Sequence, residues 1–180
     1  MEVISTRFSG LYLIQPKVFG DHRGYFFESF RQDIFKAAVG SVEFVQDNES
    51  MSNRGILRGL HFQKPPFAQG KLVRVIRGAV LDVAVDVRKD SPTYGQHISV
   101  ELSAENKTMM YVPPGFAHGF YTLQDQTIFQ YKCTDYYHPE AEVSIAWNDS
   151  NLAIQWPDLQ PILSAKDLNG LSFSGFSSPF

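Results

Sequence analysis

A succession of short segments in which apolar and polar residues alternate limits what this chain of 180 residues can fold into. In the clearest segment, 80–88, Leu81, Val83 and Val85 share one side of the chain and Asp82 lies on the other. Successive side chains of a β-strand point to opposite faces, so this pattern predicts a strand. Similar patterns predict strands near 11–14, 25–30, 42–48, 56–63, 71–77, 97–103, 108–112, 118–123 and 127–133.

Glycine and proline residues separate these segments, for example at 77–78, 91–95 and 113–115. Only residues 31–39, which Gly40 follows, have the pattern of a helix with a C-terminal stop. So many closely spaced strands predict an all-β fold, either a sandwich or a jelly-roll barrel, with a short helix near 31–39. The sequence has no internal repeat and no interior linker, so we expect residues 1–180 to form a single domain.

Composition narrows the possible functions. The hydrophobic fraction of 43% and the charged fraction of 19% are those of a globular protein. A net charge of −3 provides no basic field that would attract nucleic acid. Cys133 is the only cysteine, so an internal disulfide is impossible. The N-terminus lacks the apolar run of a signal peptide and no segment approaches bilayer-spanning length, so we expect a cytoplasmic protein without a membrane partner.

Two regular spacings surround a group of polar residues in the middle of the chain. Five residues separate Gly55 from His61, and six separate Lys71 from Gly78. This outline resembles the first metal-binding motif of cupin barrels, which reads Gly, five residues, His-x-His, then Glu, six residues, Gly. Here Gln63 replaces the second histidine and Lys71 replaces the glutamate. An ammonium group cannot coordinate a divalent cation, so the sequence predicts metal-free proton chemistry.

The segment 113–118 matches the second cupin element, Pro-x-Gly-x-x-His, and ends at His118. It favours a cupin-type double-stranded β-helix, which is a jelly-roll barrel, and brings a second histidine to its interior. A structural histidine bonded to a neighbour is the other interpretation of His118. For His61 we expect a catalytic role, because a strand histidine near Arg58, Gln63 and Lys71 forms a polar cluster with no packing purpose.

Over almost its whole length the chain resembles the dTDP-4-dehydrorhamnose 3,5-epimerases. The matching segments are 19–28, 44–48, 57–63, 69–74, 82–88 with 91–95, 115–120, 131–137, 147–149 and 163–167. The resemblance implies a cofactor-independent isomerase of dTDP-L-rhamnose biosynthesis, which supplies cell-surface polysaccharides. Its substrate would be dTDP-4-dehydro-6-deoxy-D-glucose, a dTDP-4-keto-6-deoxyhexose. Inversion at C3 and C5 would give dTDP-4-dehydro-L-rhamnose.

The chemistry of such a reaction fits the residues. A C–H group beside a ketone is a weaker acid than an imidazolium by roughly ten or more pKa units, at about 1.4 kcal/mol each. A base alone therefore fails, and the enolate must be stabilised as it forms. His61 suits the base, and Lys71 could place a positive charge at the C4 oxygen. By resemblance Tyr131 is the proton donor on the opposite face of the sugar. The alternative for Tyr131 is an ordinary strand aromatic.

By resemblance, Asp167 is the carboxylate that orients His61. The competing interpretation is a helix capping box, since Ser164 and Asp167 have the Ser-x-x-Asp spacing. No apolar helical run follows, so we favour the His61–Asp167 pair. Asp82 could orient His118 in a similar way.

The predicted substrate-binding residues follow from the matched motifs and from what a nucleotide sugar presents. Guanidinium and ammonium groups suit the diphosphate, polar groups suit the sugar, and aromatic rings suit thymine. Taken singly, each could equally be a solvated charge or a core aromatic. The set is Arg23, Phe26, Glu28, Gln46, Asn48, Arg58, His118, Tyr137, Glu142 and Lys166.

Arg58 and His61 have opposite parity on one strand. Both can face a cavity only if the strand bulges or bends at Gly59.

The resemblance also implies a homodimer with exchanged N-terminal strands, in which residues around 23–28 reach the neighbouring barrel. Two alternatives remain open. A single-centre epimerase of a related deoxysugar pathway would use the same His61, Lys71 and Tyr131. A non-catalytic sugar-nucleotide-binding cupin would be expected to lose His61 or Tyr131, and both are present. A metal-dependent cupin oxygenase disagrees with Gln63 and Lys71.

Overall fold

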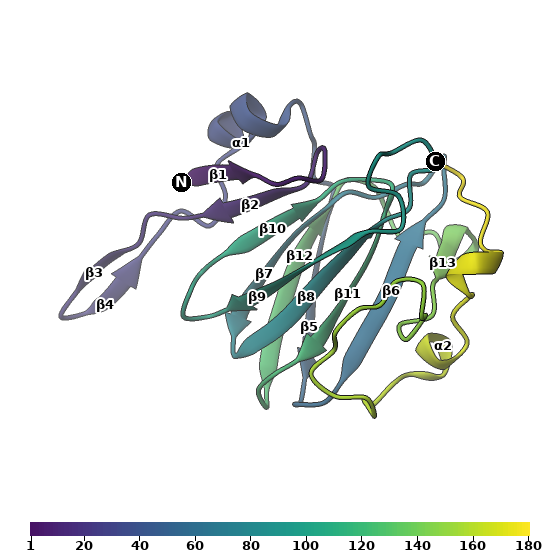
Figure 1. The fold of residues 1–180 in the computed structure, drawn as a ribbon. Helices are drawn as coiled ribbons and strands as arrows, with labels where there is room; N and C mark the ends of the chain where they lie inside the picture. The colour runs from purple at the N-terminus through teal and green to yellow at the C-terminus, as the bar shows by residue number, and fades with distance from the viewer.

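The computed structural model describes residues 1–180 and consists of two antiparallel β-sheets that face each other (Figure 1). The six-stranded sheet contains, in spatial order, β1 (Glu2–Ser5), β2 (Tyr12–Gln15), β10 (Met109–Val112), β7 (Lys71–Arg77), β12 (Thr127–Cys133) and β5 (Gln46–Ser52). The five-stranded sheet contains β13 (Glu142–Ser144), β6 (Leu57–Gln63), β11 (Phe116–Thr122), β8 (Ala79–Asp86) and β9 (His97–Ser103). The expected jelly-roll barrel is therefore confirmed.

Apolar side chains from both sheets fill the closed part of the barrel. Because strand side chains alternate, Val73 and Val75 of β7 point inward while Leu72 points out. Phe129 of β12 meets Phe120 of β11 across the interior, with ring centroids 4.2 Å apart. These aromatic rings end the apolar core and leave the remaining barrel interior to polar residues.

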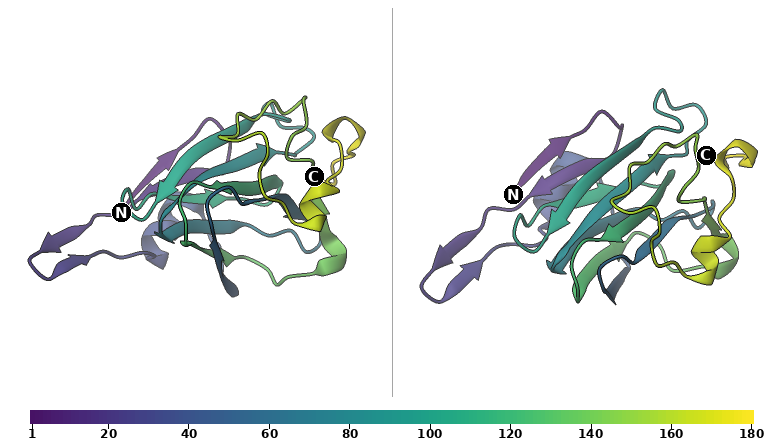
Figure 2. Two further views of the ribbon diagram at one scale, coloured as in Figure 1. Left: turned by 90° about the horizontal axis from the view of Figure 1, so that it is seen from below. Right: turned by 60° about the horizontal axis from the view of Figure 1, so that its bottom comes forward.

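The C-terminal segment covers the outer face of the five-stranded sheet. Leu60 and Phe62 of β6 and Val83 and Val85 of β8 point into this second apolar layer. It is closed by Phe173, Phe176 and Phe180 of the tail, by the short 3-10 helix Phe173–Gly175, and by Leu152 and Trp156. Figure 2 shows this yellow segment beside the barrel. The phenylalanine-rich tail therefore packs on its own barrel.

Helix α1 (Gln32–Val39) lies on the outer face of the six-stranded sheet, close to the predicted range of 31–39. Its Phe35 is fully buried and meets the ring of Tyr111 edge to face, with centroids 5.2 Å apart. Val42 and Phe44 pack in the same layer. The remaining helical turns are α2 (Ala165–Leu168) and the 3-10 helix Pro139–Ala141. No helix is both long enough and apolar enough to cross a bilayer.

A hairpin of β3 (Phe19–Asp21) and β4 (Gly24–Phe26) extends away from the barrel and pairs only with itself (Figures 1 and 2). Its side chains are exposed, including the large aromatic rings of Phe19, Tyr25 and Phe26. Much of its apolar surface is therefore open to solvent, although Lys107 Nζ lies 4.1 Å from the centre of the Tyr25 ring.

Several predicted strand boundaries are wrong. The strand expected at 42–48 spans Gln46–Ser52, because the apolar residues at 42 and 44 pack under α1 instead of pairing. The strand expected at 25–30 ends at Phe26, after which Phe30 joins the same aromatic layer. The three-residue strands β3 and β13 and the first strand, β1, had not been predicted from the alternation.

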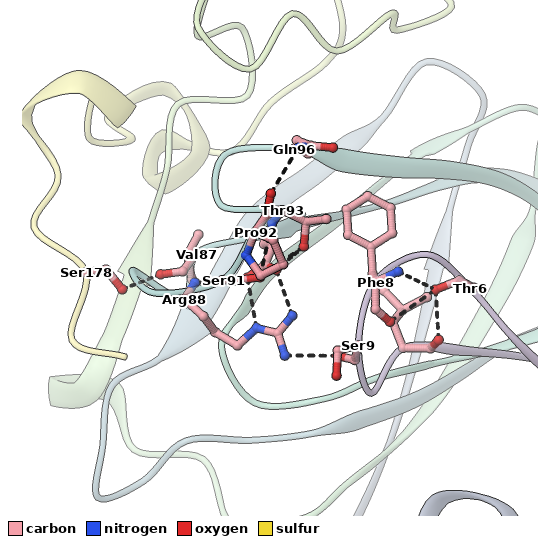
Figure 3. Close-up of polar contacts among 12 residues, drawn as sticks. Thr6, Phe8, Ser9, Val87, Arg88, Ser91, Pro92, Thr93, Gln96 and Ser178 are labelled. Atoms are coloured by element: carbon pink, nitrogen blue, oxygen red, sulfur yellow. Dashed lines mark hydrogen bonds and ion pairs between the residues drawn. The ribbon is translucent and has the colours of Figure 1, made fainter.

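A buried carboxylate fixes the β8–β9 connection. Asp86, which is inaccessible to solvent, accepts hydrogen bonds from Arg88 Nε at 2.9 Å and from the hydroxyls of Ser91 and Thr93, each at 2.6 Å. Figure 3 shows Arg88 reaching onward to the backbone of Ser9, 2.9 Å away. Burial alone would raise the pKa of Asp86, but the hydrogen bonds outweigh it and the pKa is lowered. The matched segments 82–88 and 91–95 thus link the loop after β8 to the N-terminal loop that contains Ser9.

Candidate active site

A cavity of about 610 Å³ opens between the two sheets, beyond the apolar core. All four predicted catalytic residues line it. So do seven of the predicted binding residues: Gln46, Asn48, Arg58, His118, Tyr137, Glu142 and Lys166. The structure therefore brings side chains from six strands and from α2 to one place, as a ligand site requires.

The five-stranded sheet contributes His61, whose Nε2 lies 2.6 Å from Oδ1 of Asp167. An ionised carboxylate only accepts hydrogen bonds, so Nε2 carries the proton and Nδ1 is free to accept another. Burial by itself would raise the pKa of Asp167, yet hydrogen bonds from His61 and Ser164 hold that pKa below its usual value. The pair is thus arranged as a base with its orienting carboxylate.

Half of the capping box is present beside the His61–Asp167 pair. Ser164 is the N-cap of α2, and its Oγ accepts from the backbone N–H of Asp167 at 3.2 Å. The side chain of Asp167 meanwhile turns to His61. A helix of only four residues is stable here because α2 packs against β6.

The six-stranded sheet contributes Lys71 and Tyr131, which face His61 from across the cavity. Lys71 Nζ lies 5.9 Å from the centre of the Tyr131 ring. No ion pair in the structure involves Lys71. Burial lowers the pKa of Lys71, and nearby Cys133 and Glu142 partly offset this effect. Burial raises the pKa of Tyr131, which keeps its hydroxyl protonated. A free cation and a proton donor therefore share this wall.

The expected irregularity at Gly59 is present. Along β11 His118 and Phe120 are two positions apart, but their partners on β6, His61 and Arg58, are three positions apart. This extra residue is a bulge that lets Arg58 and His61 both line the cavity. A Cβ on Gly59 would lie 2.5 Å from the Cα of Gly119, so no other residue fits the close approach of the two strands.

His118 also has a carboxylate partner. Its Nε2 lies 2.8 Å from Oδ1 of Asp82, whose side chain is fully buried. Burial raises the pKa of Asp82, although His118 and Lys71 act against this shift. His118 lines the cavity as well. Both interpretations of this histidine therefore hold, since it is bonded to a neighbour and it faces the site.

Gln63 does not present its amide as a ligand. Its Nε2 donates to the carbonyl groups of Phe67 and Tyr136, at 2.7 and 3.1 Å, and its Oε1 accepts from His138 N at 2.7 Å. The residue that replaces a cupin metal ligand thus ties two loops together. No cluster of three histidine, cysteine, aspartate or glutamate side chains in the structure could hold a metal ion.

Charged and polar groups form the rim of the cavity. Glu142 accepts from Lys166 Nζ at 2.6 Å and from the Tyr137 hydroxyl at 2.9 Å. Gln46 Nε2 donates to Asn48 Oδ1 at 3.0 Å. These contacts hold the predicted binding groups close to one another before any ligand is bound.

Three predicted binding residues lie elsewhere in the chain. Arg23 pairs with Asp21 in the protruding hairpin, and Phe26 is 67% exposed there. Glu28 pairs with Arg31 at the start of α1. None of the three lines the cavity of its own chain.

Sequence reasoning missed other residues of the site. Phe120 and Phe129 form its apolar floor, and strand parity could have identified them because they share a face with His118 and Tyr131. Ser164 was noted only as a possible cap, but its hydroxyl also donates to Asp167 Oδ2 at 2.6 Å.

Comparisons with known proteins identify one enzyme family that is similar over nearly the whole chain. A family model described as dTDP-4-dehydrorhamnose 3,5-epimerase matches residues 5–174. The dTDP-4-dehydrorhamnose 3,5-epimerase of Shigella flexneri is 53% identical over 174 residues, which cover 96% of each chain. A crystal structure of the 3,5-epimerase from Legionella pneumophila Philadelphia 1, in complex with dTDP-4-keto-L-rhamnose, is 49% identical with a TM-score of 0.93. That match covers 98% of this chain and 94% of the other.

A relative with a different outcome has the same fold. The crystal structure of a 3′-monoepimerase from Streptomyces bikiniensis, in complex with dTDP-quinovose, has a TM-score of 0.91 and 37% identity. It covers 95% of this chain and 87% of its own. The same fold therefore occurs in enzymes with different epimerisation patterns. The family model and the identity of about half to 3,5-epimerases associate this sequence with the 3,5-epimerases. The chain belongs to the dTDP-4-dehydrorhamnose 3,5-epimerase family.

Proposed function

We propose that this chain is an isomerase that converts dTDP-4-dehydro-6-deoxy-D-glucose to dTDP-4-dehydro-L-rhamnose by inverting C3 and C5. The observation that carries the proposal is the placement of His61, paired with Asp167, on one sheet and of Lys71 and Tyr131 on the other. Inversion requires a proton to leave from one face of the sugar and another to arrive at the opposite face. A ring held between the two sheets meets both requirements.

His61 Nδ1 removes the proton from the carbon beside the ketone, and Asp167 stabilises the imidazolium that forms. The electrons pass to the C4 oxygen as an enolate. Lys71 stabilises this oxyanion, since its ammonium group has no carboxylate partner and lies in a partly buried site where charge interactions are strong. Tyr131 then gives its proton to the carbon from the other face and recovers one from solvent, and His61 releases the proton that it took to solvent. The same cycle at the second carbon completes the reaction.

No metal or cofactor takes part in the proposed mechanism. Lys71 supplies the positive charge that a Lewis acid would otherwise supply. The amide of Gln63 is occupied by backbone groups, which supports a structural role for that position.

The nucleotide occupies the rim of the cavity. Lys166 and Arg58 suit the diphosphate, Gln46 and Asn48 suit polar oxygens, and Tyr137 offers an exposed ring for the base. Because Glu142 holds both Lys166 and Tyr137, it sets the position of these two binding groups.

We further propose a homodimer with exchanged N-terminal strands, in which Arg23, Phe26 and Glu28 complete the cavity of the partner subunit. Support comes from the hairpin of β3 and β4, which extends from the barrel and exposes Phe26 without contributing to its own cavity (Figure 2). An aromatic residue exposed on an arm is typical of a surface that a partner covers.

Residues 1–180 act in this proposal as one domain, because both sheets contribute to a single cavity. We place the enzyme in the cytoplasm and in dTDP-L-rhamnose biosynthesis. The single cysteine, Cys133, is a free thiol, which suits a reducing compartment.

The test is deuterium incorporation. The purified protein is incubated with dTDP-4-dehydro-6-deoxy-D-glucose in deuterated water, and NMR and mass spectrometry follow exchange at each carbon. Exchange at both C3 and C5 with inverted products is expected. Exchange at one carbon alone would assign a single-centre epimerase, the alternative that the Streptomyces bikiniensis structure makes relevant.

His61→Ala should lower the exchange rate by about 10²–10⁴-fold, the usual contribution of general base catalysis. His97→Asn is the matched control, because His97 lies on β9 away from the cavity. Unchanged exchange in folded His61→Ala would remove the base from the mechanism. Absence of exchange in the unmodified protein, together with tight substrate binding, would indicate a non-catalytic nucleotide-sugar-binding protein.

A further inference from the structure

The carboxylate of Asp167 is held by three hydrogen bonds. Oδ1 accepts from His61 at 2.6 Å and from the backbone N–H of Gly59 at 3.3 Å, and Oδ2 accepts from the Ser164 hydroxyl at 2.6 Å. The Asp167 side chain is 3% exposed, so water cannot readily replace any of these donors. Rotation of the carboxylate would break all three contacts together. Two of the donors come from β6, and the third comes from Ser164.

Ser164 bonds to Asp167 in two directions. Its Oγ accepts from the backbone N–H of Asp167 at 3.2 Å and its O–H donates to Oδ2 of the same residue. A capping box would instead have the carboxylate accept from the backbone N–H of the N-cap residue. In this arrangement the hydroxyl satisfies Oδ2, and Oδ1 remains turned toward His61.

The segment before Ser164 is anchored to the strand that carries His61. Ile162 N donates to the carbonyl of Gly55 at 2.8 Å, and Leu57 N donates to the carbonyl of Ile162 at 3.0 Å. These backbone bonds fix the start of α2 against the beginning of β6. The hydroxyl of Ser164 therefore has a defined position relative to the imidazole.

We propose that Ser164 is a positioning residue that holds the Asp167 carboxylate in the orientation His61 needs to act as a base. The inference rests on the proposed role of His61. Without the hydroxyl, the carboxylate can rotate away from Nε2, and the imidazolium loses its partner during proton abstraction. A misplaced orienting group lowers the rate without weakening substrate binding.

Two variants separate positioning from helix capping. Ser164→Gly removes the donor, yet glycine is tolerated at an N-cap, so α2 should persist. Ser164→Thr keeps a hydroxyl in the same place. Asn169→Ala is the control for loosening of α2, because Asn169 bonds to the carbonyl of Ala165 at the other end of that helix and does not touch Asp167.

We expect Ser164→Gly to lower kcat by about tenfold or more with KM within about twofold. The downfield proton signal of His61 Nε2–H should weaken or shift in NMR spectra. Ser164→Thr and Asn169→Ala should restore or retain the behaviour of the unmodified enzyme.

A wild-type kcat in Ser164→Gly would overturn the inference, as would an equal loss in Asn169→Ala. These results differ from failure of the proposed function, which would appear as unchanged exchange in His61→Ala. If His61→Ala is inactive and Ser164→Gly is fully active, only the positioning role is wrong.

Discussion

Lys71 stands where a cupin motif has a metal-ligating glutamate, and this exchange decides which chemistry the cavity supports. Its ammonium group faces the site without a carboxylate partner, beside Tyr131 and across from His61. The free energy needed to keep this charge buried lowers the pKa of Lys71. That free energy is recovered when an enolate forms, because the negative oxygen supplies the missing partner.

Lys71→Met should therefore lower the exchange rate by about 10²–10³-fold, the usual effect of removing one oxyanion donor. Lys71 must be charged to act, and burial places its pKa below the ordinary value of 10.5. Activity should accordingly fall with rising pH before an exposed lysine would lose its proton. Measurement of kcat/KM against pH in the unmodified enzyme and in Lys71→Arg checks this point. The arginine variant stays charged, so any residual activity should lack that alkaline limb.

Tyr131→Phe separates removal of a proton from its delivery. The variant keeps His61 and Lys71, so deuterium should still enter the substrate from the His61 face. Inversion should fall by about 10²-fold or more, because no acid remains on the opposite face. NMR analysis of both deuterium content and configuration distinguishes the two steps. Equal loss of exchange and inversion would assign Tyr131 to another part of the mechanism.

Strand β6 owes its catalytic geometry to its bulge. The extra residue places Arg58 and His61 on the same side of the strand, and Gly59 permits β11 to approach. The backbone of Gly59 has φ +127°, where side chains are strained, and a Cβ would also meet His118 O at 2.9 Å.

Gly59→Ala should therefore destabilise the fold by about 3 kcal/mol, the sum of backbone strain and overpacking. Gly40→Ala is the matched control. Gly40 also has a positive φ, +109°, but a Cβ there would meet nothing within 4 Å. It should cost about 1–2 kcal/mol from strain alone. Urea unfolding of both variants measures the difference, and equal costs would contradict the close-contact explanation.

The barrel presents an open cavity, and the hairpin of β3 and β4 extends away from it (Figure 1). Residues of the matched family motifs therefore lie in two distant parts of one chain, the cavity and the hairpin. The proposed dimer reunites them, since the arm of one subunit would reach the cavity of the next.

Mixing two defective variants tests this arrangement. His61→Ala lacks the base, and Arg23→Ala should raise KM by roughly tenfold or more through loss of a phosphate contact. In a mixed dimer with exchanged arms, the Arg23→Ala subunit supplies His61 and its partner supplies Arg23 to the same site. Co-refolded mixtures should show activity with the KM of the unmodified enzyme. Light scattering confirms the dimer, and a mixture with only the raised KM would show that Arg23 serves its own barrel.

Much of the fold follows from local pattern. The alternation in 71–77, 97–103 and 127–133 gave those strands with their observed boundaries. The same pattern misplaced the strand near 42–48, because alternating apolar residues under a helix look like a strand in the sequence. Very short strands such as β13 carry too few residues for any period to appear.

The sequence by itself determined the residue types on which the proposed chemistry rests: a histidine proposed as the base, a lysine in place of a metal ligand, and a tyrosine in a matched motif. These are properties of residue type and spacing, which the chain carries before it folds. Only the tertiary structure decided the double role of Ser164, the burial of Asp82 and the placement of His61 opposite Tyr131. Each depends on groups that are far apart along the chain, and only the pairing of strands and the packing of sheets bring them within bonding distance.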